Sequence, residues 1–160
     1  MGFKKYIKKI IYKQKADSVS YISHLRKIGC KVGERVTIYA PRKTLIDETK
    51  PWLIDIGNDV KITEGVTILT HGYDWAVLKR VYGDVIGSAG NVKIGNNVFI
   101  GSGARIIGKV NIASDIAIGA NAVVVKDFNK SGITIGGVPA KKISDNNSHS
   151  NLNKCLEIDK

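Results

Sequence analysis

Apolar residues recur at every sixth position along much of this 160-residue chain, and this period constrains the fold more than any other feature. An amphipathic helix repeats every 3.6 residues and a strand every 2, so a period of six fits neither. It fits a coil with three flat sides, in which each repeat forms one side and its aliphatic residue points inward. The inward positions are Val32 and Ile38, then Ile56, Ile62 and Ile68, and then Ile94, Ile100, Ile106, Ile112, Ile118 and Val124.

Turn-forming residues occur where the corners of such a coil would fall. The chain has 17 glycines, and several directly follow an inward aliphatic residue. Asn58, Asn96, Asn97 and Asn121 also lie at expected corners, where a positive φ is often needed. A sandwich of short strands would also use many tight turns, but six consecutive repeats favour the coil. The predicted fold class is therefore an all-β solenoid, a parallel β-helix of hexapeptide repeats.

Two segments interrupt the repeat, residues 43–53 and residues 72–91. A solenoid can eject insertions of this kind as loops without disturbing its core, and such loops commonly carry function. We therefore expect a functional site beside one or both segments, and we expect residues 72–91 to form an extruded loop.

Two short helices are predicted before the repeat. Residues 3–15 place apolar side chains on one face and lysines around the other. The second helix begins after Asp17 or Ser18 as its N-cap and ends at Gly29. The predicted organisation is a helical segment over residues 1–29, the β-helix domain over residues 30–144 and a flexible polar tail over residues 145–160.

The formal net charge of +11 does not indicate nucleic-acid binding, because no motif that combines aromatic and basic residues accompanies it. Many lysines cluster in the first fifteen residues, and the charge suits an anionic small molecule or membrane surface better. Cys30 and Cys155 have no metal or redox spacing, which favours reduced thiols in the cytosol. No signal peptide or apolar run of transmembrane length is recognisable. The predicted location is cytoplasmic, and peripheral contact with the inner membrane face is an open alternative.

His71 is the best candidate for a catalytic side chain. It stands at the end of a repeat triplet, directly before the longer interruption, whereas His24 lies on the second predicted helix and His149 in the tail. A side chain whose ordinary pKa is near neutrality suits a general base, although a structural or surface role is the alternative. With one histidine in the repeat region, a three-histidine zinc site is not supported, and no metal is expected.

Residues 54–143 resemble the hexapeptide-repeat acetyltransferases, especially the sugar O-acetyltransferases of the galactoside and maltose type and those of capsule and lipopolysaccharide clusters. The stretches that carry the resemblance are 70–72 (THG), 92–101 (VKIGNNVFIG), 118–122 (IGANA), 125–127 (VKD) and 137–141 (GVPAK). As a set these motifs are specific for the family, but they are only weakly specific for the acceptor.

The resemblance implies a left-handed β-helix that assembles as a homotrimer, with each active site in a groove between adjacent subunits. His71 matches the position of the family's catalytic base, and the backbone N–H of Ser102 matches the donor that stabilises the oxyanion. The acyl donor would be acetyl-CoA, beside the C-terminal coils. The residues that would contact acetyl-CoA by motif position are Gly101, Ala120, Val125, Lys126 and Lys141.

The acceptor is predicted to be a sugar hydroxyl in the biosynthesis of a surface polysaccharide. Asp47 is expected to accept hydrogen bonds from sugar hydroxyls, and Asp74 and Trp75 are expected to shape the acceptor site. Each of the three could instead only anchor a loop. Core packing is the alternative for Ala120 and Val125, and a solvated surface charge is the alternative for the two lysines.

Two other enzymatic functions and one non-enzymatic function are open at this point. Xenobiotic acetyltransferases share the fold and a similar histidine, and a histidine base could also serve the N-acetylation of an amino sugar. Serine acetyltransferases share the fold too, with a large N-terminal helical domain that this sequence does not show. The non-enzymatic alternative is a β-solenoid scaffold that attaches to a membrane through the basic helix over residues 3–15. Packing of that helix on the coils or on a neighbouring subunit is the alternative to membrane contact.

Overall fold

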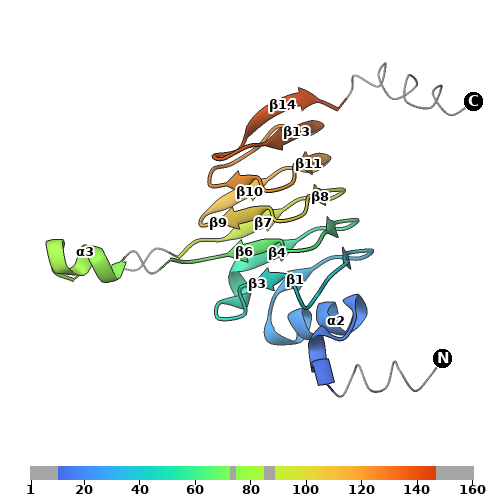
Figure 1. Cartoon of the computed structure of the whole chain (residues 1–160), viewed down its shortest axis with the longest axis horizontal. Helices are drawn as coiled ribbons and strands as arrows, with labels where there is room; N and C mark the ends of the chain where they lie inside the picture. Colours follow the sequence, from blue (N-terminus) through green and yellow to red (C-terminus); the bar gives the residue numbers. More distant parts are fainter. Residues whose placement is uncertain (1–10, 73–74, 85–88, 147–160) are drawn as a thin grey trace, which may run out of the picture.

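A computed structural model describes residues 11–72, 75–84 and 89–146 of the chain (Figure 1). The short 3₁₀ helix η1 (Lys13–Lys15) precedes helix α2 (Ser18–Ile28). Most of the helix predicted over residues 3–15 lies outside the described residues. The prediction for α2 is confirmed, because the carboxylate of Asp17 accepts a 2.8 Å hydrogen bond from the Ser20 N–H and Gly29 ends the helix with a φ of 110°.

After α2 the chain passes in turn through three sheets, here called A, B and C. Sheet A contains β1 (Lys31–Val32), β4 (Ile54–Ile56), β7 (Val92–Ile94) and β10 (Val110–Ile112). Sheet B contains β2 (Thr37–Ile38), β5 (Lys61–Ile62), β8 (Phe99–Ile100), β11 (Ile116–Ile118), β13 (Ile133–Gly136) and β14 (Lys141–Asp145). Sheet C contains β3 (Leu45–Ile46), β6 (Thr67–Leu69), β9 (Arg105–Ile107) and β12 (Val123–Val124). From β1 to β12, each circuit of the chain adds one strand to each sheet, which agrees with the predicted three-sided coil.

The described part of the chain has three corners per circuit, which we name A–B, B–C and C–A after the sheets that they join. All strand pairs are parallel except the last, in which β14 runs antiparallel to β13. The register joins residues one circuit apart, as in Ile38 beside Ile62 and Ile62 beside Ile100. A corner therefore forms a column of residues that are distant in sequence and adjacent in space.

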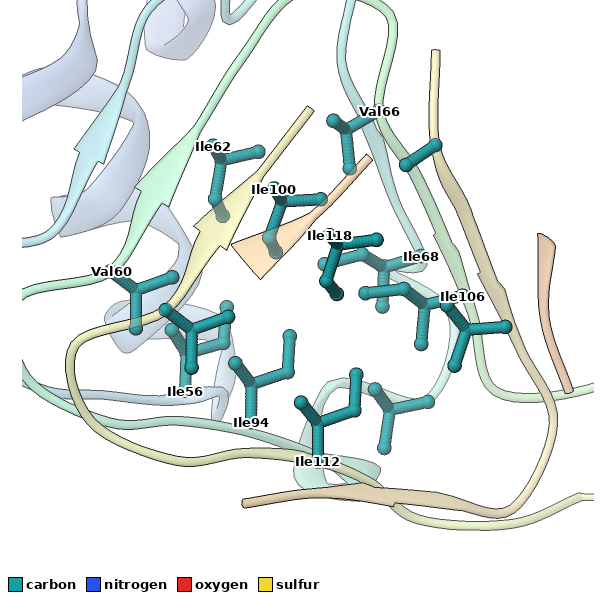
Figure 2. Packing of buried hydrophobic residues seen from close by; sticks show 14 of the residues in the cluster. Ile56, Val60, Ile62, Val66, Ile68, Ile94, Ile100, Ile106, Ile112 and Ile118 are labelled. Atoms are coloured by element: carbon teal, nitrogen blue, oxygen red, sulfur yellow. The ribbon is translucent and has the colours of Figure 1, made fainter. Parts of the chain in front are cut away.

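The inward aliphatic residues form the core (Figure 2). On sheet B, Ile38, Ile62, Ile100 and Ile118 stack in register, and each is at most 1% exposed. Equivalent stacks line the inner sides of sheets A and C. Side chains at the alternate positions of the strands, such as Phe99 and Arg105, point outward and are exposed. The period of six seen in the sequence is thus the spacing between inward positions on consecutive sides.

The coil includes strands that the repeat did not indicate. Strand β3 lies inside residues 43–53, which we expected to interrupt the repeat, and it pairs in register with β6. The 3₁₀ helix η2 (Pro51–Leu53) then precedes β4. After Val124, where the pattern ends, β13 still pairs in parallel with β11.

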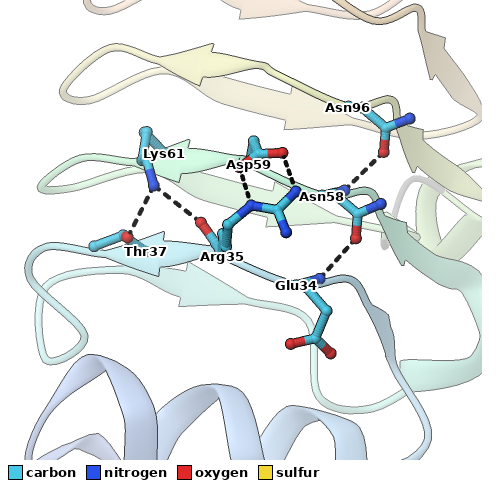
Figure 3. Close-up of polar contacts among 7 residues, drawn as sticks. All are labelled: Glu34, Arg35, Thr37, Asn58, Asp59, Lys61 and Asn96. Carbon is cyan, nitrogen blue, oxygen red and sulfur yellow. Dashed lines mark hydrogen bonds and ion pairs between the residues drawn. The ribbon is translucent and has the colours of Figure 1, made fainter.

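The A–B corner shows why asparagine recurs in this sequence (Figure 3). Asn97 has the expected positive φ of 54°, but Asn58 and Asn96 do not. Their side chains instead join successive circuits: Asn58 Oδ1 accepts from the Glu34 N–H at 2.8 Å, and Asn96 Oδ1 accepts from the Asn58 N–H at 2.8 Å. Side-chain acceptors thus satisfy corner N–H groups that would otherwise depend on water.

Helix α2 covers the β1 end of the coil (Figure 1). Tyr21, Ile22 and Leu25 of α2 are buried as part of the same apolar core. Ser18 Oγ accepts a 2.9 Å hydrogen bond from the Ile38 N–H, which ties the start of the helix to β2. The helix is therefore held in a fixed position beside the first circuit.

We expect Ile100→Ala to destabilise the fold by roughly 2–5 kcal/mol, because the substitution removes a fully buried side chain from the middle of a stack. The measurement is the free energy of unfolding in urea. Ile143→Ala is the matched control, since Ile143 is 67% exposed and should lose less than about 0.5 kcal/mol. An equal loss in the two variants would contradict the core described here.

Candidate functional site

His71 lies at the C–A corner, two residues after β6 ends. The chain leaves the coil here and returns at Ala89, which forms an antiparallel bridge with His71. The Thr70 carbonyl accepts a 2.8 Å hydrogen bond from the Gly90 N–H, so the two ends of the insertion are held together. His71 therefore stands at the base of the ejected segment, on the rigid edge of the coil.

Asp47 reaches His71 because of the parallel register of sheet C. β3 pairs with β6 so that Ile46 lies beside Ile68, and the Asp47 N–H donates to the Ile68 carbonyl at 2.9 Å. The residues that follow the two strands then meet at the same corner. The carboxylate Oδ2 of Asp47 lies 2.7 Å from Nδ1 of His71.

The carboxylate of Asp47 is buried, with a side-chain exposure of 3%, and two threonines hold it. Thr70 donates its hydroxyl to Oδ2 at 2.5 Å and its N–H at 3.2 Å, while Thr49 donates its hydroxyl to Oδ1 at 2.6 Å and its N–H at 3.0 Å. Burial raises the pKa of Asp47, but the hydrogen bonds from Thr49 and Thr70 outweigh this effect and keep the pKa well below its ordinary value. The group is an anion at neutral pH.

An ionised carboxylate can only accept hydrogen bonds, so Nδ1 of His71 carries the hydrogen in this pair. In the neutral imidazole the lone pair then belongs to Nε2, which is the arrangement that a general base requires. Asp47 also limits rotation of the ring. The side chain of His71 is 16% exposed, which leaves it accessible to a small molecule.

His71 lines a surface hollow of about 580 Å³. The hollow combines apolar walls with the polar groups at the C–A corner, and it lies on the first two circuits of the coil. Its lining residues are Leu45, Ile46, Asp47, Glu48, Thr49, Leu69, His71 and Gly72. A larger hollow of about 700 Å³ lies along sheet B, with Lys61 and Phe99 in its wall, but it contains none of the residues predicted for the site.

The structure gives Asp47 a different contact from the one expected. We expected its carboxylate to meet sugar hydroxyls, but both oxygens are bound by protein donors and the side chain is buried. In the structure it binds Nδ1 of His71 instead. Thr49 and Thr70 had not been anticipated as partners of Asp47: the Thr49 contact is a local one two residues along the chain, whereas the Thr70 contact depends on the pairing of β3 with β6. Glu48, which also lines the hollow, was missed for the same reason.

The other predicted residues divide between two corners. Gly101, Ser102 and Ala120 follow β8 and β11 at the B–C corner, and Lys141 lies at the same end of sheet B, paired with Gly136. Val125 and Lys126 follow β12 at the C–A corner, on the His71 side. Within one chain, sheet C separates Ser102 from His71. One chain therefore does not bring the predicted base and the predicted oxyanion donor together.

Four of the five residues predicted to contact acetyl-CoA are exposed: Ala120, Val125, Lys126 and Lys141. Gly101 differs, because it is buried and a Cβ there would lie 2.6 Å from the Ala120 nitrogen. Close packing of two circuits therefore explains this glycine without a ligand. Ser102 is exposed, and its hydroxyl donates to Thr63 Oγ1 at 3.3 Å.

Trp75 begins helix α3 (Trp75–Tyr82), which belongs to the ejected segment and has no buried residue. Its ring is 37% exposed and is not part of the wall of the hollow. Asp74, the other residue predicted to shape the acceptor site, lies outside the described residues. The placement of both residues at an acceptor site stays a prediction.

Two further features are absent from the described residues. No cluster of three or more histidine, cysteine or acidic side chains has a geometry that could hold a metal ion. No helix in this part of the chain is long and apolar enough to cross a membrane.

Comparison with known proteins identifies close sequence relatives. Protein CapG of Staphylococcus aureus is 43% identical over 119 residues, which are 74% of this chain and 67% of CapG. A serine acetyltransferase of Mycobacterium tuberculosis is 34% identical over 115 residues, which are 72% of this chain but only 43% of that protein. No family model matches the chain.

Solved structures of acetyltransferases share the fold. A maltose O-acetyltransferase from Clostridium difficile 630 has a TM-score of 0.56 and 24% identity, over 79% of this chain and 75% of that one. The hexapeptide-repeat acetyltransferase VCA0836 of Vibrio cholerae, in complex with acetyl coenzyme A, has a TM-score of 0.57 and 17% identity, over 88% and 84% of the two chains. The chain thus belongs to the hexapeptide-repeat acetyltransferase family and is an acyltransferase.

The buried carboxylate of Asp47 should affect the stability of the fold in acid. Since the pKa of Asp47 is lower in the folded than in the unfolded chain, ionised Asp47 stabilises the fold above the ordinary aspartate pKa of about 3.9. This contribution is lost as the pH falls below that value towards the folded pKa. We expect the free energy of unfolding to fall less steeply below about pH 4 in Asp47→Asn than in the wild type.

Denaturant unfolding at a series of pH values measures this difference. Asp84→Asn is the control, because Asp84 is a 95% exposed carboxylate in the ejected segment and its loss should leave the wild-type pH dependence intact. Identical curves for wild type and Asp47→Asn would show that the carboxylate is not held as described.

Proposed function

We propose that this protein transfers an acetyl group from acetyl-CoA to a hydroxyl of a sugar, with His71 as the general base. The Asp47–His71 pair carries the proposal: a buried, ionised carboxylate 2.7 Å from Nδ1 holds a partly exposed imidazole at the edge of a hollow. Surface polysaccharide biosynthesis is the proposed setting, in the cytoplasm and in contact with the inner membrane face.

In the proposed reaction, Nε2 of His71 takes the proton from the acceptor hydroxyl as that oxygen attacks the acetyl carbonyl. The imidazolium, stabilised by Asp47, then returns the proton to the departing sulfur. No acyl-enzyme is needed, and the buried Cys30, whose pKa is raised to about 11 by burial and by the charges of Glu48 and Asp47, is a poor nucleophile. The oxyanion is proposed to accept a hydrogen bond from the Ser102 N–H.

Acetyl-CoA supplies a thioester, which is an activated acyl group with a good leaving group. The exposed residues of the C-terminal circuits fit such a molecule. Val125, which is 49% exposed, offers an apolar surface, and Lys126 and Lys141 offer positive charge for phosphates. The acetyl coenzyme A in the VCA0836 structure supports this donor.

We also propose that the active form is a homotrimer of left-handed coils. The division of site residues between the B–C and C–A corners supports a shared site. A head-to-tail contact joins two different surfaces of identical chains, and such contacts close into rings. Ser102 of one subunit would then face His71 of the next. The proposed handedness rests on family membership.

L-Serine is the second candidate acceptor, favoured by the 34% identity to a serine acetyltransferase. The same base could remove the proton from a serine hydroxyl, so His71 does not distinguish the two acceptors. The charge around the hollow distinguishes them.

His71→Ala should lower kcat by roughly 10²–10⁴-fold, because a positioned base contributes about that factor. Transfer is measured as thiol release from acetyl-CoA in the presence of neutral sugars. The variant should keep the wild-type melting temperature and acetyl-CoA affinity, since His71 is at the surface of the coil. Wild-type turnover by a folded His71→Ala protein would overturn the mechanism.

A further inference from the structure

Glu48 is the second carboxylate in the wall of the hollow, and the proposed proton transfer does not use it. The side chain is bound to helix α2: the Tyr21 hydroxyl donates to Oε1 at 3.1 Å, and Nε2 of His24 lies 2.9 Å from Oε2. The rings of Tyr21 and His24 stack with their centroids 6.4 Å apart. Two residues of helix α2 therefore fix a carboxylate in the wall of the hollow that His71 also lines.

The two adjacent carboxylates differ in burial and in partners. Asp47 is buried and bound by Thr49, Thr70 and His71, whereas Glu48 has a side-chain exposure of 32%. Burial raises the pKa of Tyr21 far above its ordinary value, and the charge of Glu48 raises it further, so Tyr21 stays a neutral donor. A carboxylate has about four acceptor positions, and the contacts with Tyr21 and His24 use two.

A carboxylate held in this way is suited to bind hydroxyl groups. Its orientation is set before a ligand arrives, so binding does not have to order a flexible glutamate. A sugar carries hydroxyls on neighbouring carbons, so one can react at His71 while another donates to Glu48. Leu45 and Leu69, in the same wall, provide apolar surface for the C–H groups of a sugar ring.

The hollow is also unsuited to an anionic acceptor. Its lining, within the described part of the chain, contains Asp47 and Glu48 but no lysine or arginine. A carboxylate or phosphate near the reacting hydroxyl would meet negative charge, and these lining residues of the His71 subunit include no lysine or arginine to balance it. A ligand whose negative charge would be left unpaired in this way binds poorly, so the wall selects against it. L-Serine and uronic acids both carry such a carboxylate.

We propose that Glu48, held by Tyr21 and His24, determines acceptor specificity: it binds a hydroxyl next to the reacting one and excludes acceptors with a carboxylate or phosphate close to that position. The acceptor is thus an uncharged polyhydroxyl compound. This inference rests on the proposed function, because it concerns the acceptor half of the site at His71.

The test measures KM and kcat for acetyl transfer by the full-length wild type, Glu48→Gln and Tyr21→Phe. Maltose, glucose and galactose serve as neutral acceptors. Glucuronic acid and L-serine serve as acceptors with a carboxylate. Glu48→Gln should raise the KM for the best neutral sugar by about tenfold, since a hydrogen bond to a carboxylate is replaced by a weaker one to a neutral amide oxygen. The KM for acetyl-CoA should stay within about twofold. The ratio of kcat/KM for glucuronic acid to that for the neutral sugar should rise. Tyr21→Phe should shift the same parameters in the same direction, by less.

Glu34→Gln is the matched control, because Glu34 also binds α2, through Arg26 at 3.1 Å, but is not part of the wall of the hollow. It should leave every KM unchanged. If Glu48 only anchors α2, the Glu48 and Glu34 variants will alter the melting temperature without altering the KM for the acceptor. That result overturns the role proposed for Glu48 and leaves the proposed function standing.

A wild type that prefers L-serine or glucuronic acid also overturns the role proposed for Glu48. A wild type that transfers acetyl to none of the five acceptors overturns both that role and the proposed function.

Discussion

Parallel register between strands one circuit apart determines where every functional side chain of this protein lies. Because Ile46 lies beside Ile68, and Ile68 beside Ile106, the residues that follow β3, β6 and β9 collect in one column at the C–A corner. The buried aliphatic stack makes this register costly to shift, since a slip by one residue would turn inward side chains to solvent. The coil therefore acts as a rigid support for groups at its corners.

The Asp47–His71 pair is a direct result of that register. The two residues are 24 positions apart in the sequence, yet they occupy neighbouring positions in the same column. Thr49 and Thr70 add four hydrogen bonds that keep the carboxylate ionised despite its burial. The imidazole is thus oriented before any substrate binds, which is the condition under which a general base is most effective.

The repeat made the coil predictable, since a period of six has few structural solutions. Periodicity also indicated His71, which lies where the pattern is interrupted. It could not reveal Asp47 as the partner of His71, because β3 is two residues long and the surrounding corner residues do not follow the repeat. For the same reason Glu48 was not anticipated, and the role of His24 on α2 depends on how the helix packs at the end of the coil. Contacts of this kind follow from three-dimensional register and not from local sequence.

The asparagines also show that local sequence does not reveal contacts between circuits. Residue type correctly placed Asn58 and Asn96 at corners, but it suggested a backbone role. In the structure their side chains accept hydrogen bonds from the neighbouring circuit. Gly101 was expected to face a ligand, and the close approach of Ala120 supplies a packing reason for it.

We propose that the active site combines the C–A corner of one subunit with the B–C corner of another. Mixing two inactive variants tests it most directly: His71→Ala, which lacks the base, and Ala120→Trp, which blocks the B–C corner at an exposed position. After joint unfolding and reassembly at equal amounts, random pairing across head-to-tail interfaces restores about one intact site in four. We expect acetyl transfer at about a quarter of the wild-type rate. Mixed assemblies with no activity above that of the separate variants would contradict it.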